Sequence, residues 1–141
     1  MKKVQYKRNI FLTICKDLNE ISNVVLNKFK EIHENDNSNR FYIIPGGSTP
    51  SLFYSKLASS IKQWNNTIML LSDERLVNEK SNDSNISMVK KLLINKIRLS
   101  IKPTLISYFN ELNIKNISPS LKVDNNIPMN INPCLGIVGM G

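Results

Sequence analysis

The residues best suited to chemistry form the glycine-rich turn Gly46-Gly47-Ser48-Thr49, which follows a short apolar run. Glycine permits positive φ angles and a close approach of a ligand to the backbone. Pro50 suits the first position of a new helix, and Thr49 is suited to cap it. The N–H groups of such a helix start, with the Ser48 and Thr49 hydroxyls, form a pocket for an anion. We therefore expect this turn to bind a phosphate-bearing small molecule. A turn that only connects and caps a helix would show the same pattern.

Two further segments, Asp73-Glu74-Arg75 and Gly139-Met140-Gly141, also follow apolar runs. Because ligands of α/β proteins bind outside the carboxyl ends of parallel strands, we expect both segments to meet the glycine-rich turn at one edge. Arg75 suits bidentate recognition of phosphate or stabilisation of an oxyanion. Asp73 suits holding a sugar hydroxyl or acting as a base. The alternative for the charged segment is an exposed turn with a local salt bridge.

Other nucleotide-binding motifs fit these segments less well. The glycine-rich turn lacks the lysine that a Walker loop needs after its last glycine. The Gly139 and Gly141 pair is compatible with the start of a dinucleotide fingerprint, but the third glycine of that fingerprint would lie beyond residue 141.

The histidine and the cysteines have simpler explanations than catalysis. His33, the only histidine, stands in a polar stretch, where we expect it to be a solvated residue at the end of a helix. Cys15 and Cys134 are far apart and match no metal-binding spacing. We therefore expect two reduced, buried thiols and no metal site.

Apolar periodicity predicts a single α/β domain over residues 1–141. We expect helices over residues 13–32, 50–61 and 84–97, and buried strands over residues 40–44, 67–71, 104–109 and 134–138. In the second helix, we expect Leu52, Phe53, Leu57 and Ile61 to face the core. Residues 110–133 contain three prolines and are expected to be irregular. Strands that alternate with helices imply a mainly parallel sheet with helices on both faces.

Composition narrows the classes of partner. An apolar content of 41% with 21% charged residues favours a globular over a disordered chain. No apolar run is long enough for a membrane span or a secretory signal, so we expect a cytoplasmic protein with no membrane partner. We also expect it to be a monomer or a weak homodimer. The net charge of +8 would suit nucleic acid, but the basic residues are scattered. We expect no nucleic-acid partner, and keep a basic nucleic-acid-binding module as an alternative.

Three motifs carry a family resemblance. They are Pro45 to Pro50 with Leu52 and Tyr54; Leu71 to Val77 with Ser84, Asn85 and Met88; and Leu135 to Gly141. In this order and spacing, over residues 13–141, they resemble the 6-phosphogluconolactonase family. The pattern of that family is a GGSTP-type loop, a DERxV segment with a downstream Ser-Asn, and a strand that runs into GMGxDGHT.

The resemblance implies a Rossmann-like fold and the hydrolysis of 6-phosphogluconolactone to 6-phosphogluconate, in the oxidative pentose phosphate pathway. It implies no metal or organic cofactor, and a phosphorylated sugar lactone as the small-molecule partner. By resemblance, the turn from Gly46 to Thr49 lines the substrate pocket near the phosphate. Arg75 would bind substrate charge and Asp73 would contact the sugar, both in support of catalysis.

One departure bears on activity. The general base of the family is the histidine of the GHT segment, whereas this chain ends at Gly141. We therefore expect this chain to be a truncated N-terminal portion of the family. Because a positioned base is worth about 10²–10⁴-fold in rate, we expect its activity to be impaired. Two alternatives stay open: a glucosamine-6-phosphate deaminase or isomerase-like enzyme, and a non-catalytic sugar-phosphate-binding fragment. By resemblance, Arg75 favours the lactonase, because the deaminases usually carry an aromatic residue at that position.

Overall fold

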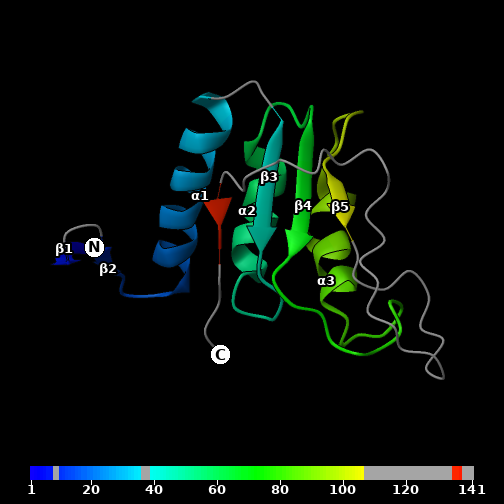
Figure 1. The fold of residues 1–141 in the computed structure, drawn as a ribbon, viewed down its shortest axis with the longest axis horizontal. Helices are drawn as coiled ribbons and strands as arrows, with labels where there is room; N and C mark the ends of the chain where they lie inside the picture. Colours follow the sequence, from blue (N-terminus) through cyan, green and yellow to red (C-terminus); the bar gives the residue numbers. More distant parts are fainter. Residues whose placement is uncertain (8–9, 36–38, 107–134, 138–141) are drawn as a thin grey trace.

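The computed structural model describes residues 1–7, 10–35, 39–106 and 135–137. Its elements, in chain order, are β1 (Lys2–Lys7), β2 (Ile10–Ile14), α1 (Leu18–Asn35), β3 (Arg40–Ile44), α2 (Ser51–Ser60), β4 (Thr67–Leu71), α3 (Asn85–Leu92), the 3₁₀ turn Ile94–Lys96, β5 (Thr104–Ile106) and β6 (Leu135–Gly136). Four strands form a sheet in the order β5-β4-β3-β6, and β1 and β2 form a separate antiparallel hairpin (Figure 1). Every pairing within the four-stranded sheet is parallel, which confirms the predicted α/β class.

The register of the sheet brings three strand ends to one edge. Along β3 and β4, Arg40 lies opposite Thr67 and Ile44 lies opposite Leu71. On the other side of β3, the N–H of Ile137 donates to the carbonyl of Ile43 at 2.8 Å, directly after β6. Since all three strands run in the same direction, the segments that follow β3, β4 and β6 start at the same edge of the sheet.

The core lies between one face of the sheet and the helices. Alternate residues of β3 and β4 are buried, because successive side chains of a strand point to opposite faces. The buried side chains of the sheet pack with residues of α1, α2 and α3, among them Phe29, Tyr42, Ile44, Phe53, Leu57, Met69, Leu71 and Val89. The described helices therefore cover one face. Among the described elements none covers the opposite face, where the alternation of strands and helices also leads us to expect a helix.

The first helix begins later than predicted. Thr13 lies in β2 rather than in the helix, in keeping with the β-branched and aromatic residues of that strand. Helix α1 starts after Asp17, whose Oδ1 accepts the N–H of Glu20 at 2.8 Å. In return, the Glu20 carboxylate accepts the N–H of Lys16 at 2.7 Å. This reciprocal pair resembles a capping box, and it fixes where the helix starts.

The predicted orientation of the second helix is correct except at one residue. Phe53, Leu57 and Ile61 are buried, but Leu52 is 39% exposed, so that part of the prediction was wrong. Residues four apart share a helix face. Leu52 does not lie on the face that buries the other three residues. Cys15 is half-buried with a free thiol. Cys134, residues 107–109 of the third predicted strand and the predicted irregular segment 110–133 lie outside the described residues.

His33 is buried, contrary to the sequence prediction, with 2% of its surface exposed. Its Nε2 lies 2.8 Å from the carbonyl oxygen of Gln63, and its Nδ1 lies 2.9 Å from the hydroxyl of Tyr42. Because a carbonyl only accepts, Nε2 carries the proton and the Tyr42 hydroxyl donates to Nδ1. The prediction failed because His33 follows Phe29 by four residues, and therefore shares the buried face of α1.

None of the described helices combines the length and apolar character needed to cross a lipid bilayer.

Candidate functional site

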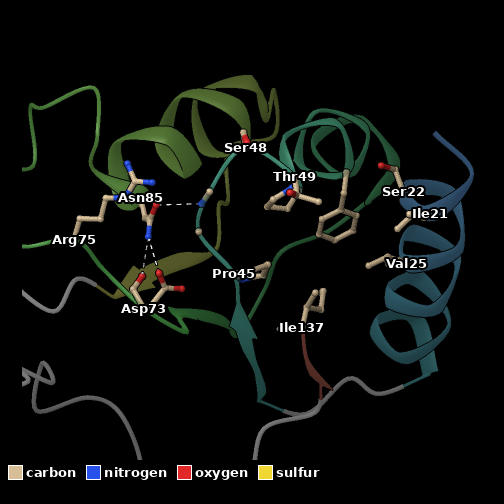
Figure 2. A pocket seen from close by; sticks show the side chains of 14 residues that line it. Ile21, Ser22, Val25, Pro45, Ser48, Thr49, Asp73, Arg75, Asn85 and Ile137 are labelled. Carbon is tan, nitrogen blue, oxygen red and sulfur yellow. Dashed lines mark hydrogen bonds between the residues drawn. The ribbon is translucent and has the colours of Figure 1, made fainter. Parts of the chain in front are cut away.

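A cavity of about 430 Å³ opens at the carboxyl edge of the sheet. Most of its polar lining follows β3 and β4, with Ser22 of α1 and Asn85 of α3 in addition, and apolar side chains come from α1, α2 and the residue after β6 (Figure 2). The six residues that the sequence singles out for the site all line it: Gly46, Gly47, Ser48, Thr49, Asp73 and Arg75. The structure therefore brings together residues that lie up to 29 positions apart in the chain, because parallel pairing of β3 and β4 places their ends side by side.

The glycine-rich turn leaves β3 through Pro45 and enters α2. Gly47 has a φ of +82°, in the left-handed region that glycine adopts without strain. The N–H of Ser51 donates to the carbonyl of Ser48 at 3.2 Å, which closes the turn. Within the described part of the chain, the N–H groups of Ser48 and Thr49 have no hydrogen-bond partner. These groups, on an exposed turn beside a helix start, can donate to an anion.

The predicted cap of α2 is not formed. The residue that directly precedes the helix is Pro50, and no side chain caps the helix at this end. The Thr49 hydroxyl is therefore not used in capping, which corrects the sequence prediction. The helix begins at Ser51, one residue later than predicted, because the carbonyl of Pro50 accepts the first helical hydrogen bond, from Tyr54 at 3.0 Å.

Tyr54 of α2 is hydrogen-bonded to Pro45, the residue that leads into the glycine-rich turn. Its buried hydroxyl donates to the carbonyl of Pro45 at 2.5 Å. Burial, and secondly the nearby charge of Asp73, raise the pKa of Tyr54 far above its usual value. The phenol therefore keeps its proton and remains a donor to Pro45.

The carboxylate of Asp73 is held by neighbours on both oxygens. The Ser72 hydroxyl donates to Oδ1 at 2.9 Å, and the Asn85 amide donates to Oδ2 at 3.1 Å. The side chain of Asp73 is thereby oriented while it still lines the cavity. An oriented carboxylate with remaining lone pairs can accept a hydrogen bond from a ligand hydroxyl.

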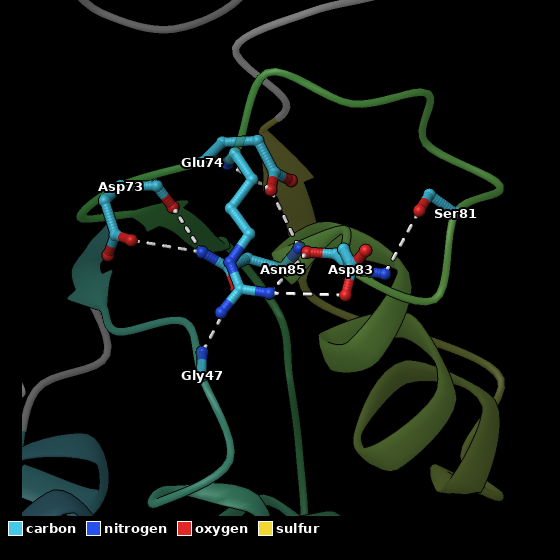
Figure 3. A network of polar contacts seen from close by, with 7 residues as sticks. Gly47, Asp73, Glu74, Ser81, Asp83 and Asn85 are labelled. Atoms are coloured by element: carbon cyan, nitrogen blue, oxygen red, sulfur yellow. Dashed lines mark hydrogen bonds and ion pairs between the residues drawn. The ribbon is translucent and has the colours of Figure 1, made fainter. Parts of the chain in front are cut away.

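Glu74 has a structural role, although it stands between two predicted site residues. Its carboxylate accepts the N–H of Asn85 at 2.8 Å (Figure 3), and also the N–H of Ile86 at 2.8 Å and the hydroxyl of Ser84 at 3.3 Å. It therefore satisfies the amino end of α3, where a negative charge is favourable. The N–H groups of Asn85 and Ile86 at the start of α3 are therefore already bonded to the Glu74 side chain.

Arg75 lies at the rim of the cavity with 58% of its side chain exposed. It forms an ion pair with Asp83 at 3.5 Å, which matches the local salt bridge expected as the alternative. An exposed pair of this kind is worth about 0–1 kcal/mol, so a phosphate with two negative charges can compete with Asp83 for the guanidinium.

Part of the lining was not predicted from the sequence. Ile21 and Val25 of α1 and Phe53 of α2 form an apolar wall. Asn85 joins the polar side, although the sequence identified it only as part of a motif. The 3- and 4-residue spacing of α1 indicates an apolar face, but contains no signal that this face borders a cavity.

The third predicted segment is described only at its start. Ile137 lines the cavity, whereas Gly139, Met140 and Gly141 lie outside the described residues. The described ranges contain no cluster of three or more histidine, cysteine or acidic side chains that could hold a metal ion. The single histidine, His33, does not line the cavity.

Comparisons with known proteins place this chain in a family. Residues 17–124 match the family model described as glucosamine-6-phosphate isomerases/6-phosphogluconolactonase. A search of curated protein sequences gave no significant match. Among solved structures, 6-phosphogluconolactonase from Thermotoga maritima is similar at 28% identity and a TM-score of 0.52, over 61% of this chain and 41% of that chain. The enzyme from Trypanosoma cruzi is similar at 26% identity and a TM-score of 0.58, over 67% of this chain and 38% of that chain. The enzyme from Leishmania guyanensis is similar at 26% identity and a TM-score of 0.59, over 69% of this chain and 38% of that chain.

The chain thus spans about two-fifths of the length of these solved structures. Their structural similarity to this chain agrees with the fold described above. Because that model matches well over half of the sequence, the chain belongs to the glucosamine-6-phosphate isomerase/6-phosphogluconolactonase family.

Proposed function

We propose that the cavity binds 6-phosphogluconolactone and that the function of this chain is of the 6-phosphogluconolactonase type. The observation that carries the proposal is the convergence of the glycine-rich turn, Asp73 and Arg75 on one cavity. Family membership and the similarity to structures named as 6-phosphogluconolactonases support it. A phosphorylated sugar lactone offers the phosphate and the hydroxyl groups that these residues suit.

In this proposal, the phosphate binds at Gly46 to Thr49. The N–H groups of Ser48 and Thr49 donate to its oxygens, and the Arg75 guanidinium adds charge-assisted hydrogen bonds. Asp73 accepts a hydrogen bond from a sugar hydroxyl. Val25 and Phe53 give the same cavity an apolar wall.

Hydrolysis of a lactone needs a water molecule that attacks the carbonyl carbon. The bond from this carbon to the ring oxygen then breaks, and the ring oxygen leaves as a hydroxyl. By family resemblance, the base that takes the proton from water is a histidine. In this chain the only histidine, His33, is buried in the core with both ring nitrogens in contact with partners. His33 is therefore not placed to act as that base, and we propose that the described residues of the cavity serve to bind the substrate.

The product 6-phosphogluconate is the direct probe, because it carries both the phosphate and the sugar hydroxyls. Isothermal titration should show that it binds, and that gluconate, which lacks the phosphate, binds at least about tenfold more weakly. Equal binding of the two ligands would contradict a phosphate site. Tighter binding of glucosamine 6-phosphate would favour the deaminase or isomerase alternative within the same family.

Arg75→Ala should weaken the binding of 6-phosphogluconate by about 10- to 100-fold, because hydrogen bonds to charged groups are worth about 1.5–3 kcal/mol. Arg98→Ala is the matched control. It removes the same charge from an exposed residue that does not line the cavity. If both variants bind with the affinity of the native chain, Arg75 does not belong to the site.

A further inference from the structure

We propose that Asn85 is a positioning residue that ties the glycine-rich turn to Asp73, and so sets the distance between the phosphate and sugar subsites. This inference rests on the proposed function, since it assigns Asn85 a role in the same cavity. Asn85 is the first residue of α3, only 4% exposed, and lies between the two segments (Figure 3).

Both the oxygen and the nitrogen of the Asn85 side-chain amide form hydrogen bonds. Its Oδ1 accepts the N–H of Gly47 at 3.1 Å. Its Nδ2 donates to the carbonyl and to Oδ2 of Asp73, at 3.2 and 3.1 Å. A backbone N–H can only donate and a backbone carbonyl can only accept, so the partners themselves determine which way the amide points. One side chain therefore links the turn after β3 to the segment after β4.

Gly46 leaves the space that the Asn85 amide occupies. A Cβ at Gly46 would lie 2.1 Å from both Cγ and Nδ2 of Asn85. Among the described glycines only Gly47 has a positive φ, so Gly46 is needed for space and Gly47 for conformation. The absence of a side chain at Gly46 lets the amide reach the backbone of the turn.

The backbone of Asn85 is itself held. Its N–H donates to Glu74 Oε1 at 2.8 Å, and the next N–H, of Ile86, donates to Glu74 Oε2 at 2.8 Å. Glu74 directly follows Asp73 in the chain. The segment after β4 therefore accepts hydrogen bonds from both the backbone and the side chain of Asn85. The turn is thus bonded to a side chain whose own backbone is held by Glu74.

The charged and titratable groups around Asn85 come from the loop between β4 and α3 and from α2. Asp73 and Glu74 contact it, Arg75 lies at the same cavity with its partner Asp83, and Tyr54 of α2 interacts with Asp73. Asn85 brings no charge into this group. An aspartate at position 85 would place a second carboxylate within hydrogen-bond distance of Asp73.

The substitution Asn85→Asp separates a positioning role from a purely structural one. It keeps the acceptor for Gly47 but replaces the donor to Asp73 by a repelling carboxylate. Two carboxylates at this distance raise the pKa of one of them, and on acidification they share a proton that restores one hydrogen bond. We expect 6-phosphogluconate to bind about 10- to 100-fold more weakly at pH 8. The loss relative to the native chain should shrink as the pH falls to 5.5.

Asn78→Asp is the matched control. It adds the same charge to the loop that precedes α3 and keeps the single contact of that side chain, in which Oδ1 accepts the N–H of Lys80. It should bind 6-phosphogluconate like the native chain at every pH. If Asn85→Asp also shows the native affinity and pH profile, the proposal is wrong. Should Asn85→Asp not fold, Gly46→Ala takes its place in the titration at pH 8, because it displaces the same amide from the other side.

Amide hydrogen exchange tests the link without any ligand. The Gly47 N–H should exchange faster in Asn85→Leu, which removes the acceptor, than in Asn85→Asp, which keeps it. Equal exchange in Asn85→Leu and the native chain would overturn the link even if sugar phosphates bind. If the native chain binds neither 6-phosphogluconate nor glucosamine 6-phosphate, the proposed function fails, while the exchange result still decides whether Asn85 holds the turn.

Discussion

Nδ1 of His33 lies 2.9 Å from the hydroxyl oxygen of Tyr42, within the contact between α1 and β3. The ring of His33 also stacks on Phe29, with centroids 5.5 Å apart. This histidine therefore joins α1 to the sheet that carries the glycine-rich turn. Burial lowers the pKa of His33, with a further lowering by the charge of Arg40, against the opposing hydrogen bond to Gln63 and the charge of Glu34.

We predict that the chain loses stability as the pH falls below about 6.5, the usual pKa of histidine in an unfolded chain. The unfolded state then binds a proton that the folded state resists, so the stabilisation is complete above this pH and declines below it. The decline is at most about 1.4 kcal/mol per pH unit for one group. Urea unfolding at pH 7.5, 6.5 and 5.5 measures it. His33→Gln should show a flatter dependence, and equal slopes in both proteins would exclude His33 as the cause.

The Glu74→Gln variant should lower the free energy of unfolding by about 1–3 kcal/mol, because one of the two charge-assisted bonds at the start of α3 is lost. Denaturant unfolding at pH 7 measures the loss. Glu31→Gln is the control, since Glu31 forms only an exposed pair with Lys28, and we expect a change below about 1 kcal/mol there. A similar effect of the two substitutions would mean that Glu74 does not cap α3.

The Tyr54→Phe variant leaves the carbonyl of Pro45 without its partner, at a cost of about 1–3 kcal/mol in unfolding free energy. Because the pKa of Tyr54 is raised far above its usual value, the cost should be the same at pH 6 and pH 9. Thermal or denaturant unfolding at both values is the measurement. Ser59→Ala removes an exposed hydroxyl from the same helix and should change little. A cost that disappears at pH 9 would show that the phenol ionises.

The pair Leu57→Ala and Leu52→Ala tests the orientation of α2. Leu57 is fully buried, so its truncation should cost about 2–5 kcal/mol. Leu52 is 39% exposed and should cost clearly less, although both substitutions remove the same atoms from one helix. Urea midpoints compare the two variants directly. Equal costs would contradict the described face of α2.

Much of the framework that holds the site could be predicted from the sequence. The strands over residues 40–44 and 67–71 have the predicted bounds, because each apolar run is followed by a marked change to glycine or charged residues. Parallel pairing then places the segments after both strands at one edge. For this reason the glycine-rich turn, Asp73 and Arg75 could be expected to meet.

Other features depend on contacts between residues far apart in the chain. Asn85 bonds to Gly47 across 38 positions, and no local pattern specifies that contact. The buried position of His33 likewise depends on Tyr42 and Gln63, which a reading of polarity along the sequence does not reveal. The sequence by itself determined the strands, the turn and the chemistry at their ends. Only the tertiary structure decided which polar side chains are buried and which of them join separate loops, because hydrogen-bond satisfaction in a core depends on spatial neighbours.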